Sequence, residues 1–165
     1  MPTYQSRRTY LSELFTPLVR RIKDNASTAP EPTRWERVDR TVDEMRARLA
    51  EANNEEQFQA VGLLGREALI SLAQSVYDPQ RHPAEYEGVK ISATDAQRML
   101  EVYFATDLAG GNNQEARAHA KSALKLALAL QHRRTADFRH AALCVEATTS
   151  VINIVAIISG RRDPT

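Results

Sequence analysis

The sequence has little of several features that would indicate a familiar kind of site. It contains one cysteine, Cys144, which excludes an internal disulfide and a multi-cysteine metal site. Its 22 Lys and Arg residues almost balance its 21 Asp and Glu residues, so the formal net charge is +1. Any nucleic-acid or membrane site must therefore be a local patch. One thiol is compatible with the reducing conditions of a cytosol.

Common catalytic and cofactor motifs are also missing from the sequence. Gly110-Gly111 lacks the lysine and the spacing of a phosphate-binding loop. There is no His-Glu-x-x-His motif, the four histidines are too scattered to indicate a zinc site, and nothing resembles a nucleophile elbow. The sequence therefore predicts neither a metal nor a cofactor.

Neither a secretory signal nor a membrane span is expected. Residues 1–8 contain no apolar core of a signal peptide. The one membrane-like run, residues 141–159, contains Glu146 and Asn153. A glutamate in mid-bilayer would cost roughly 2–3 kcal/mol or more, so we interpret this run as a buried helix. The expectation is a cytoplasmic protein without a membrane partner.

Apolar residues recur every three or four positions through most of the chain, which is typical of amphipathic helices. No segment shows sustained alternation, so no sheet is expected. The prediction is an all-α bundle of five or six helices in a single domain over 1–165, with an N-terminal helix and linker over 1–32 and the bundle core over 33–160. The apolar final helix should be central or at an interface. The helices are expected over 9–23, from Thr33 to the stop at Asn53-Asn54, over 55–77, from Ser92 or Thr94 to Leu108, and over 114–130 and 141–158.

Polar residues mark where several of these helices should begin. Asn53-Asn54 can end one helix and cap the next, and Asp137 can cap the last one. Capping boxes are predicted for the pairs Thr33 and Glu36, Thr94 and Gln97, and Asn112 and Glu115.

Two glycines interrupt the helix expected over 55–77. Gly62 and Gly65 each cost about 1 kcal/mol relative to alanine, which is tolerable where another backbone packs closely. Arg66 and Glu67 follow them, and we expect these side chains to face solvent. The alternative is that one of them reaches a site near residues 131–140. Residues 78–91 are expected to form a plain loop.

The segment 131–140, Gln-His-Arg-Arg-Thr-Ala-Asp-Phe-Arg-His, is the strongest candidate site. It lies between two core-building helices. Arginine binds phosphate through a charged fork, and histidine titrates near neutral pH and can act as a general acid or base. Together they carry the chemistry that RNA cleavage needs without a metal.

This segment resembles the motif of the HEPN superfamily, which consists of small helical bundles. The family's hallmark is an arginine, four to six arbitrary residues and a histidine, close to the last helix. Arg134 and His140 fit with five residues between them, and Arg133 and His140 fit with six. The resemblance implies a metal-independent endoribonuclease of a bacterial defence or toxin–antitoxin type, working as a homodimer in which two copies form one cleft.

The resemblance also implies roles for the residues of the segment. His140 would be the acid or base, and Arg134, with Arg133, would hold the scissile phosphate. His132 and Arg139 would be auxiliary. A second alignment places His132 at the family's histidine, and the positions of the arginine then read Lys125-Leu126-Ala127. That alignment implies an inactive member.

A purely structural interpretation of the segment stays open. The arginines near the end of the fifth helix would then interact with its dipole, worth about 0.3–1 kcal/mol each. Arg139 and His140 would be solvated in the first turn of the next helix. The function would then be that of a non-catalytic interaction or assembly module, or of a protein that binds RNA or a nucleotide without cleaving it. A second protein of a defence or toxin–antitoxin operon is the expected partner besides RNA.

Overall fold

The computed structural model describes residues 13, 15–17, 32–131 and 135–162. The chain divides into two compact units, Met1–Pro32 and Thr33–Thr165, and the second contains all the elements discussed below. Of the helix predicted over 9–23, only residues 13 and 15–17 are described, and these are helical. The remainder of that prediction lies outside the described residues.

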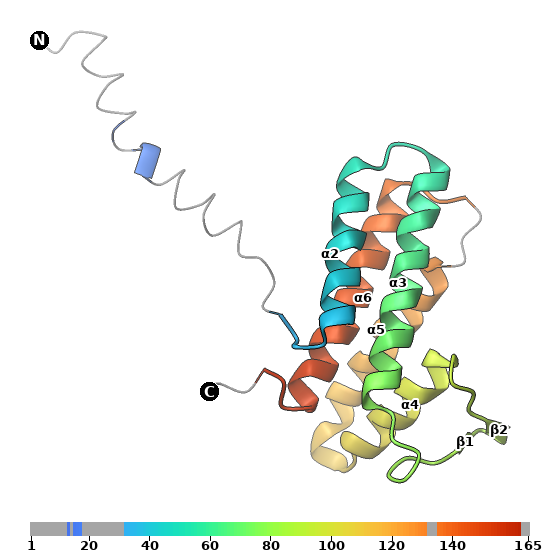
Figure 1. Ribbon diagram of the computed structural model, residues 1–165. Coiled ribbons are helices and arrows are strands. Elements are labelled where there is room, and N and C mark those ends of the chain that lie inside the picture. Colours follow the sequence, from blue (N-terminus) through green and yellow to red (C-terminus); the bar gives the residue numbers. More distant parts are fainter. Residues whose placement is uncertain (1–12, 14, 18–31, 132–134, 163–165) are drawn as a thin grey trace, which may run out of the picture. The chain divides into compact units, whose positions relative to one another are not determined.

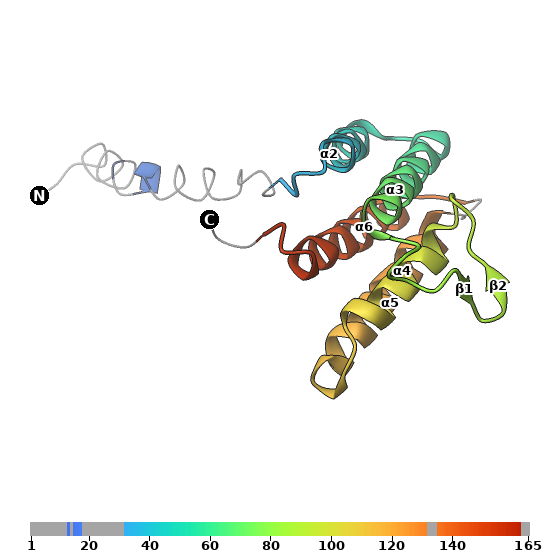
Figure 2. The ribbon, with the colours of Figure 1, turned by 60° about the horizontal axis from the view of Figure 1, so that its bottom comes forward.

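The second unit is a bundle of α-helices, as the sequence predicted. Helix α6 packs against α5, α3 and α2, and α4 packs against α3 and α5 (Figures 1 and 2). The final helix is therefore central to the bundle. The helices are α2 (Glu36–Glu51), α3 (Glu55–Val76), α4 (Ala96–Asp107), α5 (Gln114–Gln131) and α6 (Phe138–Ile158).

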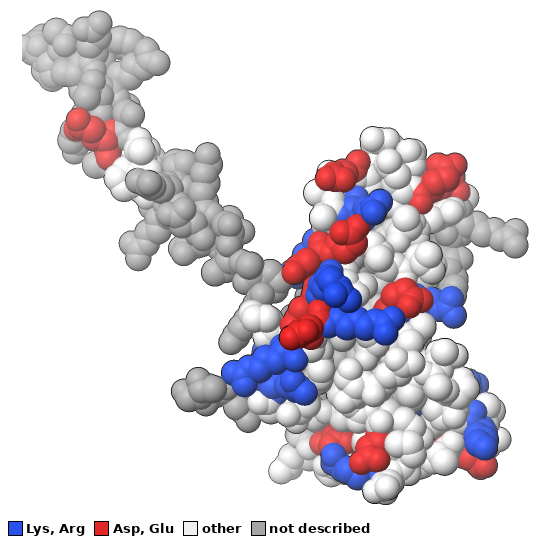
Figure 3. Space-filling view, viewed as in Figure 1, with Lys and Arg blue, Asp and Glu red and all other residues white. Residues whose placement is uncertain are grey.

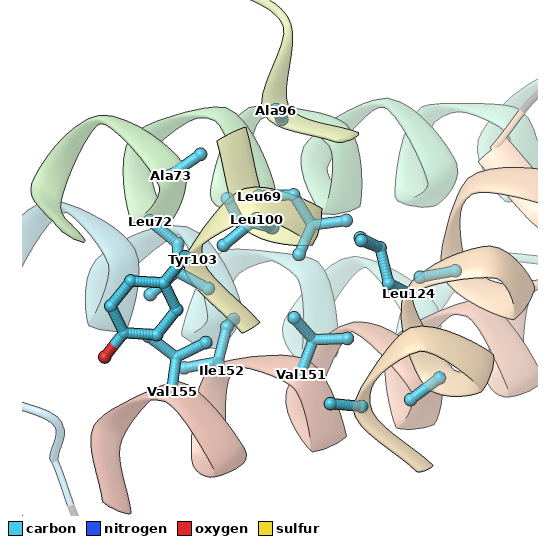
Figure 4. Packing of buried hydrophobic residues seen from close by; sticks show 14 of the residues in the cluster. Leu69, Leu72, Ala73, Ala96, Leu100, Tyr103, Leu124, Val151, Ile152 and Val155 are labelled. Atoms are coloured by element: carbon cyan, nitrogen blue, oxygen red, sulfur yellow. The ribbon is translucent and has the colours of Figure 1, made fainter. Parts of the chain in front are cut away.

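The core lies between α3, α4, α5 and α6, where large aliphatic side chains are almost fully buried (Figure 4). Burying one such side chain contributes about 1.5–3 kcal/mol, so this cluster is the main source of stability. By length and composition α6 could cross a membrane, but 56% of its most apolar stretch is buried inside the bundle. The fully buried members include Leu69, Leu72, Leu100, Phe104, Leu124, Val151 and Val155.

The start of α2 differs from the predicted capping box, which was wrong. The N-cap is Trp35, which makes no side-chain capping bond. Arg34 has a φ of 65°, and this turn directs Thr33 towards Asp39 rather than Glu36. The backbone N–H and the hydroxyl of Thr33 donate to Oδ1 of Asp39 over 3.0 and 2.7 Å.

Two other predicted capping boxes were also wrong. Helix α4 is capped by Asp95, whose side chain accepts from the N–H of Arg98 over 3.1 Å, so the cap lies one residue after Thr94. Helix α5 follows directly from a 3-10 turn over Gly111–Asn113, which leaves Asn112 inside the turn rather than at a cap. The predicted caps at Asn54 and Asp137 are confirmed.

A small hairpin corrects the prediction that the chain has no sheet. Strands β1 (Glu85–Tyr86) and β2 (Val89–Lys90) pair antiparallel within the region predicted as a plain loop. Glu87 and Gly88 between them have φ values of 51° and 76°, which is typical of a two-residue hairpin turn. Two-residue strands are too short to show alternation, so periodicity cannot detect them.

Close packing explains both glycines of α3. A Cβ atom on Gly62 would lie 3.4 Å from Cα of Gln131 at the end of α5, which confirms the predicted close approach of a second backbone. Gly65 instead faces side chains of α2 and α6. Arg66 and Glu67 are exposed, as predicted.

Candidate functional site

The predicted arginine–histidine segment is described only in part. His132, Arg133 and Arg134 lie outside the described residues. That Arg134 and His140 converge on one phosphate therefore stays a prediction. Arg139 is described, and its side chain is exposed in the first turn of α6.

His140 is held by Asp137, the residue that caps α6. One carboxylate oxygen of Asp137, Oδ1, accepts the backbone N–H of His140 over 2.8 Å. The same oxygen lies 2.7 Å from Nδ1 of the His140 imidazole. The carboxylate therefore lies against the imidazole as well as against the backbone of the same residue. The side chain of His140 is about one quarter exposed, at 25%.

The same contacts change the acidity of Asp137. The hydrogen bond from the backbone of His140, followed by the charge of its imidazole, holds the pKa of the Asp137 carboxyl below its usual value. The carboxylate is therefore charged at neutral pH. An aspartate in this position can orient an imidazole for acid–base chemistry.

The surroundings of His140 fix the first turn of α6 against α3. The rings of Phe138 and Phe58 meet edge to face, with 6.4 Å between their centroids. Phe138 remains 59% exposed, an unusual position for a phenylalanine. At the end of α5, the side-chain amide of Gln131 is buried and has no hydrogen-bond partner among the described residues. Within the described part of the chain, this end of the bundle thus combines a histidine held beside Asp137 with an unpaired amide at Gln131 and an exposed ring at Phe138.

A second histidine forms a hydrogen-bonded contact inside the fold that sequence reasoning missed. His82 lies in the segment predicted as a plain loop, yet its side chain is fully buried. Its Nε2 lies 2.9 Å from Oδ2 of Asp107, at the end of α4. Its Nδ1 lies 2.9 Å from the backbone N of Asp78 and 3.1 Å from the carbonyl oxygen of the same residue. Arg81 donates to the other oxygen of Asp107 over 3.1 Å.

Aromatic rings enclose this histidine. Tyr77 stacks on His82 with 5.6 Å between ring centroids, and Tyr103 lies against it at 5.7 Å. The arrangement fastens the loop after α3 to the end of α4. No motif signals it, because His82 and Asp107 are 25 positions apart in the sequence.

A cleft of about 370 Å³ opens beside this pair. Its lining includes Trp35 from the start of α2, Arg81 and Tyr103, and Ser159 and Arg161 from the end of α6. Arg161 lies over the ring of Trp35 at 5.1 Å from its centroid and donates to the carbonyl of Arg34 over 3.0 Å. The cleft therefore brings together segments from both ends of this unit.

Comparison with other proteins adds nothing on either site. Comparison of the chain with protein-family models, with curated proteins and with solved structures finds no match. The likeness to the HEPN superfamily consequently rests on the residues of the 131–140 segment. Among the described residues, no group of three or more His, Cys, Asp and Glu side chains could hold a metal ion.

Proposed function

We propose that the chain is a HEPN-like, metal-independent endoribonuclease of a bacterial defence or toxin–antitoxin type, acting in the cytoplasm. The observation that carries the proposal is the contact between Asp137 and His140, in which one carboxylate oxygen orients the imidazole at the start of α6. It supports His140 as the acid or base. Arg134 and Arg133 precede His140 with five and six residues between them, and they would hold the scissile phosphate.

The proposed reaction needs a base, a cation and an acid. A base takes the proton of a ribose 2′-hydroxyl, whose oxygen attacks the neighbouring phosphorus. The bond to the 5′-oxygen then breaks, and an acid gives that oxygen a proton. The products are a 2′,3′-cyclic phosphate and a 5′-hydroxyl. Arginine stabilises the charge that builds up on the phosphate oxygens in between.

A homodimer would supply two imidazoles to one cleft, one as base and one as acid. Phe138 and Leu143 support self-association at this end of α6, because they are 59% and 41% exposed and a second copy would cover them. Asp137 would be a positioning residue that orients the imidazole. Arg139 and His132 would be auxiliary contacts to the RNA backbone.

The rival proposal is a non-catalytic interaction or assembly module on the same bundle. It is favoured by the exposed apolar side chains of α6, which extend from Phe138 to Ile157 at the opposite end of the helix. In that case the contact between Asp137 and His140 only caps the helix. The partner would be a second protein of the same operon.

The decisive experiment is cleavage of a mixed single-stranded RNA in EDTA by wild type, His140→Ala and Arg134→Ala. His119→Ala is the matched control, since His119 is an exposed histidine on α5. All variants must share the melting temperature and oligomeric state of wild type. Cleavage that is lost in the two test variants and kept in the control would support the proposal.

The other outcomes distinguish the alternatives. Loss of cleavage with His132→Ala and not with His140→Ala would move the site to the second alignment. RNA binding that weakens with salt, without cleavage, would indicate a binding protein. An absence of both cleavage and binding would contradict the ribonuclease proposal and favour the interaction module.

A further inference from the structure

The cleft beside His82 carries an inference that does not depend on the ribonuclease proposal. It lies at the end of α6 opposite to His140, and the 21 residues of that helix separate the two by about 30 Å. Its volume, about 370 Å³, is within the range of small-molecule pockets.

Two guanidinium groups border the cleft, and each contacts a neighbouring residue of the fold. Arg161 is fixed by the Trp35 ring and by the carbonyl of Arg34. Arg81 is fixed by Oδ1 of Asp107. A guanidinium has further N–H donors, and for both arginines these have no partner among the described residues. Lys and Arg side chains also gather where the start of α2 meets the end of α6 (Figure 3).

Tyr103 provides a third donor on the wall of the cleft. It is 3% exposed and lines the cleft, and its hydroxyl has no hydrogen-bond partner within the described part of the chain. The hydroxyl points away from Leu69 and Leu100 in the centre of the core (Figure 4). Burial raises the pKa of Tyr103 to about 12, so the hydroxyl keeps its proton and can donate it in a hydrogen bond. The hydroxyl oxygen keeps contact with solvent, so a ligand in the cleft can accept its hydrogen bond.

The negative charge in the cleft is already matched. Asp107 binds Arg81 with one carboxylate oxygen and His82 with the other. Ser75 and Ser159 each donate their hydroxyl proton to a backbone carbonyl, so neither competes for the donors of the cleft. The unused donors are therefore cationic or hydroxylic, and this combination suits an anion with several oxygens.

We propose that this cleft binds the phosphate group of a small molecule through Arg81, Arg161 and the hydroxyl of Tyr103. The phosphate can be free or esterified, and both forms share the chemistry that these donors recognise. Arg161 would keep its position over Trp35, and Arg81 would bridge Asp107 and the phosphate.

Trp35 makes the proposal measurable, because it is the only tryptophan of the chain and lies beneath Arg161. The full-length protein is titrated with inorganic phosphate and, separately, with ribose 5-phosphate, while its fluorescence is recorded. Sodium chloride at equal ionic strength is the control for screening. We expect a saturable change with phosphate and none with chloride. Tighter binding of ribose 5-phosphate would indicate an esterified ligand, and equal affinity would indicate the free anion.

Variants measured by calorimetry locate the site. We expect Arg81→Gln and Arg161→Gln to weaken phosphate binding by about tenfold each, and Tyr103→Phe by about threefold. Tyr103→Phe keeps the ring and its packing, so it tests the site without endangering the fold. Arg48→Gln is the matched control, because Arg48 is an exposed arginine of α2 in an ion pair with Glu44. It should bind as wild type does.

Three results would overturn the proposal. The first is the absence of a saturable change with either ligand up to about 10 mM, a very weak affinity. The second is an equal response to chloride, which would show screening rather than binding. The third is unchanged phosphate affinity in Tyr103→Phe and in both arginine variants.

Discussion

His82 and Asp107 form a buried hydrogen bond, with 2.9 Å between Nε2 and Oδ2, that connects the loop after α3 to the last residue of α4. The same carboxylate also binds Arg81, but the side chain of Arg81 is 63% exposed whereas that of His82 is fully buried. Water can replace the arginine and cannot replace the histidine. The two contacts of Asp107 should therefore contribute unequally to stability.

Replacing the two partners of Asp107 should therefore have unequal effects. His82→Leu leaves an oxygen of Asp107 and the N–H of Asp78 without a partner, and should lower the free energy of unfolding by about 2–3 kcal/mol. Arg81→Gln should lower it by less than about 1 kcal/mol, because the pair is exposed. Urea denaturation of both variants measures the difference. Equal losses would show that the burial of His82 is not what stabilises the loop.

Gly65 should not accept a side chain. A Cβ atom there would lie 3.1 Å from Oγ1 of Thr148 and 3.4 Å from both Sγ of Cys144 and Sδ of Met45. Gly65→Ala gains about 1 kcal/mol of helix propensity, but overpacking of a core costs about 1–3 kcal/mol. We expect a net loss of about 1 kcal/mol in thermal or chemical denaturation.

Two further variants test the cause of that loss. Gly111→Ala is the control, since no atom lies within 4 Å of a Cβ atom at that position. It should be neutral or slightly stabilising. Adding Thr148→Ala to Gly65→Ala should recover part of the loss, and strictly additive effects would contradict steric coupling.

Asp137 should make the stability of the fold depend on pH in the acidic range where aspartate carboxyl groups titrate. Its pKa is lower in the folded protein than the unperturbed value of 3.8, chiefly because of the hydrogen bond from the backbone of His140. A carboxyl group whose pKa is lower in the folded than in the unfolded protein stabilises the fold at pH values above its pKa in the unfolded protein. That contribution is lost as the pH falls through its pKa in the folded protein. Wild type should therefore be more stable than Asp137→Ala at neutral pH, and the difference should shrink below about pH 4.

Unfolding curves at several pH values measure this difference. Asp43→Ala is the matched control, because Asp43 is an exposed aspartate of α2. Its effect should show no comparable change across the acidic range. A stability difference for Asp137→Ala that stays constant down to the lowest pH would contradict the role of the charged carboxylate.

Tyr86 should titrate at lower pH once Glu101 is neutral. The hydrogen bond to Glu101 is the largest of the causes that raise the pKa of Tyr86 above 10.0, and the charge of Glu87 is the smallest. Glu101→Gln should shift the phenolate absorbance titration of Tyr86 towards its ordinary value, with Tyr86→Phe identifying the signal. Glu87→Gln should shift it less. A larger shift with Glu87→Gln than with Glu101→Gln would show that Tyr86 of β1 does not contact Glu101 of α4.

The helices of the bundle follow from local sequence. The apolar spacing of three and four residues predicts them, because a helix places such residues on one face whatever else the chain does. The caps at Asn54 and Asp137 and the position of His140 beside Asp137 are equally local, since they depend on residues within one turn. That part of the candidate site could be read from the sequence, whereas His132, Arg133 and Arg134 lie outside the described residues.

Tertiary structure decided the contacts that no local pattern contains. Arg161 reaches the carbonyl of Arg34 across 127 positions of the chain, and His82 reaches Asp107 across 25. Thr33 turned away from its predicted cap because Arg34 adopts a positive φ. A local sequence pattern predicts a single helix, whereas the position of a cleft depends on which ends of different helices lie together. The packing of α6 between α2, α3 and α5 determines that, so the cleft could be found only in the folded chain.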